Sequence, residues 1–202
     1  VVAHPPRFGG KLRNYDDSKT QSLTGVKAVV QIPNGVAVLA KDYWTAKKGR
    51  ELLEIDWDES SAIQRSSDEL MKEYRELAQQ PGPIAATVGD APGALATAER
   101  VLEGSYEFPF LAHAPMEPMN CVALVNDQGC EIWNGEQVQT MDQGAIAATL
   151  GLAPEQVKIN MLFAGGSFGR RANPHSDYVL EAVHIAKALK DTPVKLVWSR
   201  ED

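Results

Sequence analysis

The stretch that decides the fold is VKINMLFAGGSFGRR, residues 157–171. Val157–Phe163 is apolar and partly β-branched, which predicts a strand. Residues 165–169 hold three glycines, more than a single tight turn needs. Asn173-Pro174 then predicts the start of a helix, because proline is favoured in a first turn. The apolar stripe of that helix is Val179, Ala182, Val183, Ala186 and Leu189.

A strand, a glycine-rich loop and a helix in this order can place backbone N–H groups beside an anion or a reactive centre. One interpretation is therefore a phosphate or anion site, with Gly165–Arg171 as its loop and Arg170 and Arg171 as cationic donors. A plain tight turn stays open as the alternative. A P-loop is disfavoured because no Gly-Lys-Ser/Thr follows, and the spacing does not match G-x-G-x-x-G.

The loop also matches G-x-S-x-G, the nucleophile elbow of serine hydrolases, with Ser167 as the nucleophile. Two observations count against this interpretation. The elbow helix should begin at the serine, whereas Pro174 predicts a later start. His175, Asp177 and His184 also lie on or beside one helix, so they cannot converge on Ser167.

Upstream of this loop, residues 1–60 predict a small α+β unit. Val26–Ile32 and Val36–Ala40 are strand candidates, Tyr43–Leu53 has helical spacing, and Leu53–Trp57 alternates as a strand does. Residues 61–83 predict a helical connector. Its helix begins with the Ser66-Ser67-Asp68-Glu69 signature, carries a stripe of Leu70, Tyr74 and Leu77, and ends before Pro81-Gly82-Pro83.

Residues 84–202 predict a second α+β domain. Glu99–Phe108 alternates as a strand does, and Cys121–Asn126 with Cys130–Trp133 predicts a hairpin around Asp127-Gln128. A helix capped by Thr140 should end at Gly151. In the hairpin the two cysteines are out of register, so we expect free, half-buried thiols rather than a disulfide. The histidines are scattered, and no CxxC motif is present, so no metal site is predicted.

Composition limits the function classes. The net charge is −7 and no cluster of Lys and Arg stands out, which argues against nucleic-acid binding. No apolar run reaches the roughly 18 residues of a membrane span. Val1-Val2-Ala3-His4 and Val194–Val197 look like strands cut close to an end, so we expect a piece of a longer protein. The parent's compartment, cytoplasm or periplasm, is not given by the sequence, and apolar surface left exposed could drive self-association.

Five segments of the chain resemble the xanthine dehydrogenase/aldehyde oxidase family of molybdenum hydroxylases. The resemblance is narrower to its isoquinoline 1-oxidoreductase beta-subunit, aldehyde dehydrogenase-like, branch. Pro5–Lys11 and Gly25–Val30 resemble the family's α/β hammerhead domain. Ala112–Asn120, Gly165–Arg171 and Val197–Asp202 resemble segments of its molybdopterin-binding domain.

The resemblance implies roles for two loops. The loop beside the molybdenum would be Gly165, Gly166, Ser167, Phe168 and Gly169, with Phe168 and Gly169 against the metal's oxo ligands. The neighbouring substrate pocket would be lined by His113, Met116 and Glu117. From the sequence alone, Glu117 could equally be a solvated turn carboxylate between Pro115 and Pro118.

The family further implies a molybdopterin cofactor, as its cytosine dinucleotide, and an iron–sulfur partner subunit. Its purine-oxidising members carry an acid where this chain has Ala172, so we expect an aldehyde or N-heterocycle as the small-molecule substrate. The glutamine common in the 113–117 loop of xanthine-type enzymes is also missing. The family's general-base glutamate and most pterin contacts fall after Asp202. We therefore expect this chain alone to bind no cofactor and to be inactive.

Overall fold

The structure is a computed structural model that describes all residues, 1–202, and it confirms a mixed α+β fold. The chain forms two compact units. The first unit combines residues 1–63 with residues 113–202, and the second is residues 64–112. Each unit is described by itself.

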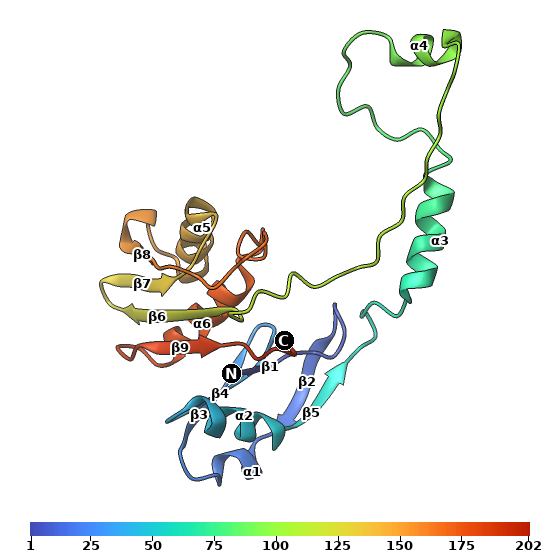
Figure 1. The fold of residues 1–202 in the computed structure, drawn as a ribbon. Coiled ribbons are helices and arrows are strands. Elements are labelled where there is room, and N and C mark those ends of the chain that lie inside the picture. Colours follow the sequence, from blue (N-terminus) through green and yellow to red (C-terminus); the bar gives the residue numbers. More distant parts are fainter. The chain divides into compact units, whose positions relative to one another are not determined.

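The larger sheet of the first unit has the strand order β8-β7-β6-β9 (Figure 1). Its strands are β6 (Asn120–Asn126), β7 (Gly129–Asn134), β8 (Val157–Met161) and β9 (Val194–Val197). β6 and β7 form the predicted hairpin, in which Val125 lies opposite Cys130. Asn126 Oδ1 accepts hydrogen bonds from the Gln128 and Gly129 N–H groups and so holds the turn. β8 runs parallel to β7, which requires a crossover connection.

Helix α5 (Gln139–Leu150) and a short 3-10 turn (Pro154–Gln156) supply that crossover. The helix ends at Gly151, whose φ of 70° is left-handed, as predicted. The predicted cap was wrong: Val138 is the N-cap residue, and Thr140 lies inside the first turn. Strand β8 is also shorter than predicted and ends at Met161, because the chain turns toward the glycine-rich loop there.

Helix α6 (Asp177–Ala188) is the centre of the unit. Its predicted stripe is correct, since Val179, Ala182, Val183 and Ala186 are fully buried. They pack in one cluster with Cys121, Ala123 and Leu196 of the large sheet and with Val2, Ile32 and Ala37 of the N-terminal sheet. The predicted start at Asn173-Pro174 was wrong. Asn173 Oδ1 accepts from the His175 N–H, Ser176 is left-handed at φ 51°, and the helix begins only after this turn.

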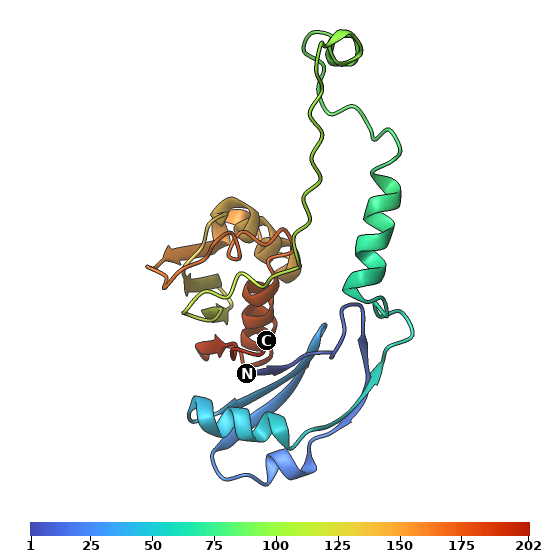
Figure 2. The ribbon, with the colours of Figure 1, turned by 45° about the vertical axis from the view of Figure 1, so that its right-hand side comes forward.

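The N-terminal sheet has the order β1-β4-β3, with β1 (Val2–Ala3), β3 (Val26–Ile32) and β4 (Gly35–Ala40). Helices α1 (Ser18–Gln21) and α2 (Tyr43–Glu51) pack on it (Figure 2). A side chain at Gly49 of α2 would come within 2.9 Å of Val38, so glycine permits the close approach of helix and strand. β2 (Lys11–Asp16) and β5 (Glu54–Asp58) form a separate antiparallel pair.

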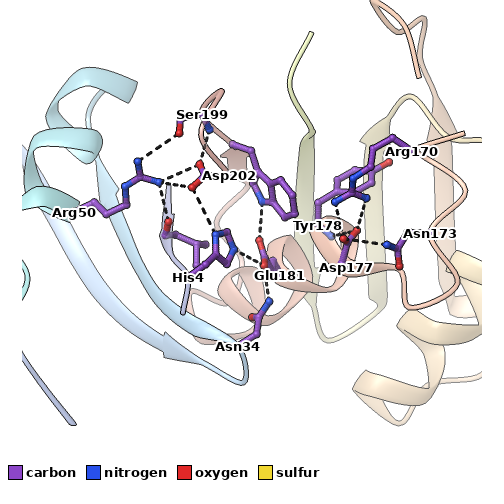
Figure 3. A network of polar contacts seen from close by, with 12 residues as sticks. His4, Asn34, Arg50, Arg170, Asn173, Asp177, Tyr178, Glu181, Ser199 and Asp202 are labelled. Atoms are coloured by element: carbon purple, nitrogen blue, oxygen red, sulfur yellow. Dashed lines mark hydrogen bonds and ion pairs between the residues drawn. The ribbon is translucent and has the colours of Figure 1, made fainter. Parts of the chain in front are cut away.

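A network of polar contacts joins the N-terminal segment to α6 and to the residues after β9 (Figure 3). The buried Glu181 carboxylate lies 2.7 Å from His4 Nε2 and accepts from Trp198 Nε1 at 2.8 Å and from Asn34. Asp202 lies 3.7 Å from His4 Nδ1 and accepts from Arg50 Nη1 at 2.8 Å. His4 is therefore held between two carboxylates.

The second unit, residues 64–112, contains α3 (Ser67–Leu77) and α4 (Ala91–Thr97). The Ser66 capping box at the start of α3 is confirmed. The predicted strand over Glu99–Phe108 was wrong, because these residues form no regular structure. Every side chain in that segment is exposed, so alternation there has neither a partner strand nor a core to bury one face.

Both cysteines are free, as predicted, but they are fully rather than half buried. Burial raises the pKa of Cys121 above its usual range and that of Cys130 to about 11, so both stay thiols at neutral pH. No helix combines the length and the apolar character that a membrane crossing would need.

Candidate functional site

The glycine-rich loop after β8 has an unusual backbone. Gly166, Phe168 and Gly169 have φ values of 103°, 57° and 93°, all in the left-handed half of conformational space. Phe168 is the only non-glycine among them, and a positive φ is uncommon for such a bulky residue. Its side chain is nevertheless 74% exposed. The loop is therefore not shaped by packing of Phe168 into the core.

The strained backbone leaves a run of N–H groups free. The N–H of Gly165 donates to Glu117, and those of Arg170, Arg171 and Ala172 donate to oxygens within the loop. The four N–H groups between them, of residues 166–169, have no acceptor in the protein. Gly169 also leaves open space, since a side chain there would meet only His113 Nε2, at 3.9 Å. Such a run suits a ligand that presents several oxygens.

The structure brings the 113–117 loop against this loop. The Glu117 N–H donates to the Gly165 carbonyl at 3.3 Å, and the Gly165 N–H donates back to Glu117 Oε2 at 2.6 Å. Glu117 is thus not a solvated turn carboxylate. Hydrogen bonds from Asn120 and Gly165, with the nearby Arg171, lower its pKa, so it remains ionised. Its carboxylate ties the two loops together.

Arg171 is the buried cation of the site, with 2% of its surface exposed. Its guanidinium donates to the carbonyls of Gly166 at 3.2 Å and Gly135 at 3.3 Å. It also lies 3.2 Å from Glu117 Oε1. Arg171 therefore fixes three backbone segments from inside.

Arg170 is used within the protein as well. It pairs with Asp177 at 2.8 Å, and its guanidinium lies 5.2 Å from the Trp198 ring centroid. Helix α6 begins only at Asp177, six residues after Arg171. The anion-site interpretation thus loses both of its arginine donors and the adjacent helix N-terminus, although the free N–H groups remain.

The other predicted residues lie as follows. His113 is exposed, and its Nε2 would lie 3.9 Å from a Cβ added at Gly169, whereas Met116 is 86% exposed. The buried Pro115 lies against Gly166, where an added Cβ would be 3.5 Å from it. The structure therefore places His113 and Glu117 beside the loop and leaves the Met116 side chain pointing to solvent.

Sequence reasoning missed Gln137. The Ser167 hydroxyl donates to Gln137 Oε1 and accepts from the Arg171 N–H, at 3.0 Å. Neither partner is a base, so Ser167 has no catalytic triad and the hydrolase interpretation fails on geometry. Gln137 follows β7, thirty positions away in sequence, and no local pattern marks it. Gln137 comes close to Ser167 only because β7 pairs with β8 in parallel, and this pairing cannot be seen in the local sequence.

These features define the class of the protein: a mixed α+β domain with a strained, glycine-rich loop that offers free backbone donors at the end of a parallel strand. The family model of the molybdopterin cofactor-binding domain matches residues 76–202, which is more than half of the chain. The chain belongs to this family.

Comparisons with individual proteins support the family assignment. The chain is 31% identical to isoquinoline 1-oxidoreductase subunit beta of Brevundimonas diminuta, over 100% of this chain and 27% of that protein. It is 30% identical to a membrane-bound aldehyde dehydrogenase (pyrroloquinoline-quinone) of Gluconacetobacter polyoxogenes, over 98% of this chain and 26% of that protein. The chain thus spans about a quarter of the length of these relatives.

Among solved structures, quinoline 2-oxidoreductase from Pseudomonas putida 86 superposes with a TM-score of 0.69 at 18% sequence identity. The match covers 100% of this chain and 31% of that one. At this identity the match supports the fold alone, and it confirms the predicted α+β class.

Proposed function

We propose that the chain contributes the glycine-rich loop of a molybdenum-cofactor site in a longer oxidoreductase that hydroxylates an aldehyde or an N-heterocycle. The observation that carries the proposal is the run of free N–H groups at residues 166–169, open on the side of Gly169. The donor set fits the group, because molybdenum cofactors present oxo and phosphate oxygens rather than requiring protein thiolates. The names of the relatives support the substrate class.

The cofactor, when bound, supplies the redox chemistry and an activated oxygen for transfer to an electron-poor carbon. The chain's own residues bind and orient. Gly166, Ser167, Phe168 and Gly169 give close access to the backbone and donate hydrogen bonds, and Gly165, whose N–H donates to Glu117, shapes that approach. Glu117 and Arg171 hold the loop, and Phe168 with its exposed ring excludes water on one side. His113 and Met116 line the substrate approach, with Ala172 leaving that position uncharged.

Several finer features belong to the same proposal. The cofactor would be the cytosine dinucleotide form, and electrons would leave through an iron–sulfur partner subunit. The complete protein would work in the cytoplasm or periplasm. The division into a hammerhead-like domain (1–60), a connector (61–83) and part of a cofactor domain (84–202) also stays a prediction. This chain by itself would be inactive, and its exposed apolar residues would favour self-association.

The test compares two glycine variants of the full-length protein, purified with its partners. Gly169→Ala forces a side chain into a left-handed backbone at the open face of the loop. Gly144→Ala is the matched control, because Gly144 is an exposed helical position with nothing within 4 Å of an added Cβ. We expect molybdenum and pterin content, and aldehyde or N-heterocycle oxidation, to fall at least tenfold in Gly169→Ala only. A full-length protein purified intact without pterin would refute the proposal.

A further inference from the structure

Glu136 is a buried acid that the proposed function does not use. It lies between Gly135 and Gln137, directly after β7, and only 4% of its surface is exposed. Neither carboxyl oxygen has a hydrogen-bond partner. Asn134 Oδ1, two residues earlier, is also buried and unpartnered. The pocket therefore holds three acceptor atoms without a donor.

Neighbouring donors are all engaged elsewhere. The Asn134 Nδ2 group donates to Tyr178 Oη at 3.3 Å, and Tyr178 Oη in turn donates to the Gly135 carbonyl at 3.1 Å. Ser176 Oγ donates to Asp142 Oδ1 at 2.6 Å. The Cys121 thiol faces the Val122 carbonyl. The buried Arg171 pairs with Glu117, and no cation contributes to the pKa of Glu136. No positive charge is left for Glu136.

The charges that act on Glu136 are therefore unfavourable for its ionised form. Asp142 of α5 is a second buried acid, 2% exposed, and the Cys121 and Tyr178 groups that face the pocket are neutral at pH 7. An ionised carboxylate without donors in such a site is strongly destabilising. Protonation of Glu136 removes the buried charge. It also creates an O–H group that can donate to Asn134 Oδ1, which otherwise lacks a donor.

We propose that Glu136 is a positioning residue that holds a proton in mildly acidic solution and donates a hydrogen bond from it to Asn134 Oδ1. Burial, with a smaller contribution from Asp142 and against an opposing contribution from the Asn134 side chain, raises the pKa of Glu136 to about 7. The acid is then a neutral donor in the core rather than a lone charge.

The position of Glu136 connects this proton to the glycine-rich loop. Its neighbour Gly135 accepts from Arg171, and its neighbour Gln137 accepts from Ser167. Ionisation of Glu136 would place an uncompensated charge between these two anchors. The loop should therefore keep its shape best below about pH 7. This last consequence rests on the proposed function, whereas the proton on Glu136 does not.

The first experiment compares the stability of the full chain with that of Glu136→Gln at two pH values. Glutamine keeps the shape and an N–H donor for Asn134 but cannot ionise. A carboxyl whose pKa is raised in the folded state stabilises fully below its unfolded value of 4.5, and this stabilisation is lost as pH rises to about 7. We expect equal melting temperatures at pH 5, and at pH 8 a gain on the order of 5 °C for the variant.

The exposed Glu155 supplies the control, since Glu155→Gln should change neither value. The proposal would be overturned if Glu136→Gln lowered the melting temperature equally at both pH values. It would also be overturned if the variant and the unmodified chain melted at the same temperature at pH 8. Infrared titration of the unmodified chain gives an independent readout should the variant fail to fold. A protonated carboxylic acid band should persist at pH 6 and disappear toward pH 8, whereas a carboxylate at pH 6 overturns the proposal. Neither readout requires cofactor, so pterin content tests the proposed function separately.

Discussion

Residues 113–202 and residues 64–112 both contain many apolar side chains, but they bury them very differently. In 113–202, Cys121, Ala123, Ile132 and Ile146 are completely buried. In 64–112 no residue is buried, and Phe108 is 77% exposed. Apolar content therefore does not decide burial; the presence of partner elements does.

The strands of the two regions make the same point. Asn120–Asn126 and Glu99–Phe108 both have sequences that predict a strand, yet only the first forms one, β6. β6 has β7 on one side, β9 on the other, and α6 across its face. Segment 99–108 has none of these partners. If this contrast is correct, similar substitutions should change the stability of the chain by different amounts in the two regions.

The largest effect is expected at Arg171. Replacement by Met removes a buried guanidinium that donates to the Gly135 and Gly166 carbonyls and pairs with Glu117. We expect the free energy of unfolding to fall by about 3–5 kcal/mol, measured by urea denaturation. Arg13→Met is the control: Arg13 pairs with Asp56 at the surface, and its loss should cost at most about 1 kcal/mol. Similar losses in both variants would contradict the assigned role of Arg171.

The second effect is a pH dependence at His4. Burial alone would lower the pKa of His4, but Asp202 and Glu181 together raise it to about 9. The stabilisation is therefore complete below the unfolded pKa of 6.5 and is lost as pH rises to about 9. This shift corresponds to at most about 3 kcal/mol.

Measurement of stability against pH from 6 to 10 should show this loss in the unmodified chain and not in His4→Gln. Burial would also raise the pKa of Asp202, but His4, Ser199 and Arg50 together hold it below its usual range. The stabilisation of the folded state by Asp202 is accordingly present above pH 3.8 and is lost only in acid. If stability falls with pH between 6.5 and 9 as steeply in His4→Gln as in the unmodified chain, the network around His4 does not cause this pH dependence.

A third, smaller effect is expected where the two loops touch. An alanine Cβ at Gly165 would lie 2.8 Å from Glu117 Cβ, so one of the loops must shift. We expect Gly165→Ala to destabilise by about 1–3 kcal/mol in thermal unfolding. Gly144→Ala, which meets nothing within 4 Å, should be neutral or slightly stabilising. A neutral Gly165→Ala would mean that the loops are not packed as described.

The smallest effect is expected in residues 64–112. Phe108→Ser removes a large apolar side chain that is exposed, so the change in unfolding free energy should stay within about 0.5 kcal/mol. Ile132→Ala, at a fully buried position of β7, should cost about 2–5 kcal/mol. A large loss in Phe108→Ser would show that this region buries its apolar residues after all.

The sequence by itself determined the local features: the hairpin around Asp127-Gln128, the left-handed end of α5 at Gly151, the capping box at Ser66 and the glycine-rich loop. Each depends on dihedral preferences and hydrogen bonds within a few residues, which local patterns record. The family resemblance added the expectation that residues 113–117 line a pocket beside the 165–169 loop, and their role there stays a prediction.

Only the tertiary structure decided which side chains became partners. It turned Arg171 inward, made Glu117 the tie between two loops, joined Gln137 to Ser167 and left Glu136 without a donor. It also left segment 99–108 without a sheet. These outcomes depend on contacts between residues about 30 to 50 positions apart, as from Gln137 to Ser167 and from Glu117 to Arg171. No local periodicity encodes such contacts, because the burial and the charge pairing of a side chain depend on which distant segments the whole fold packs against it.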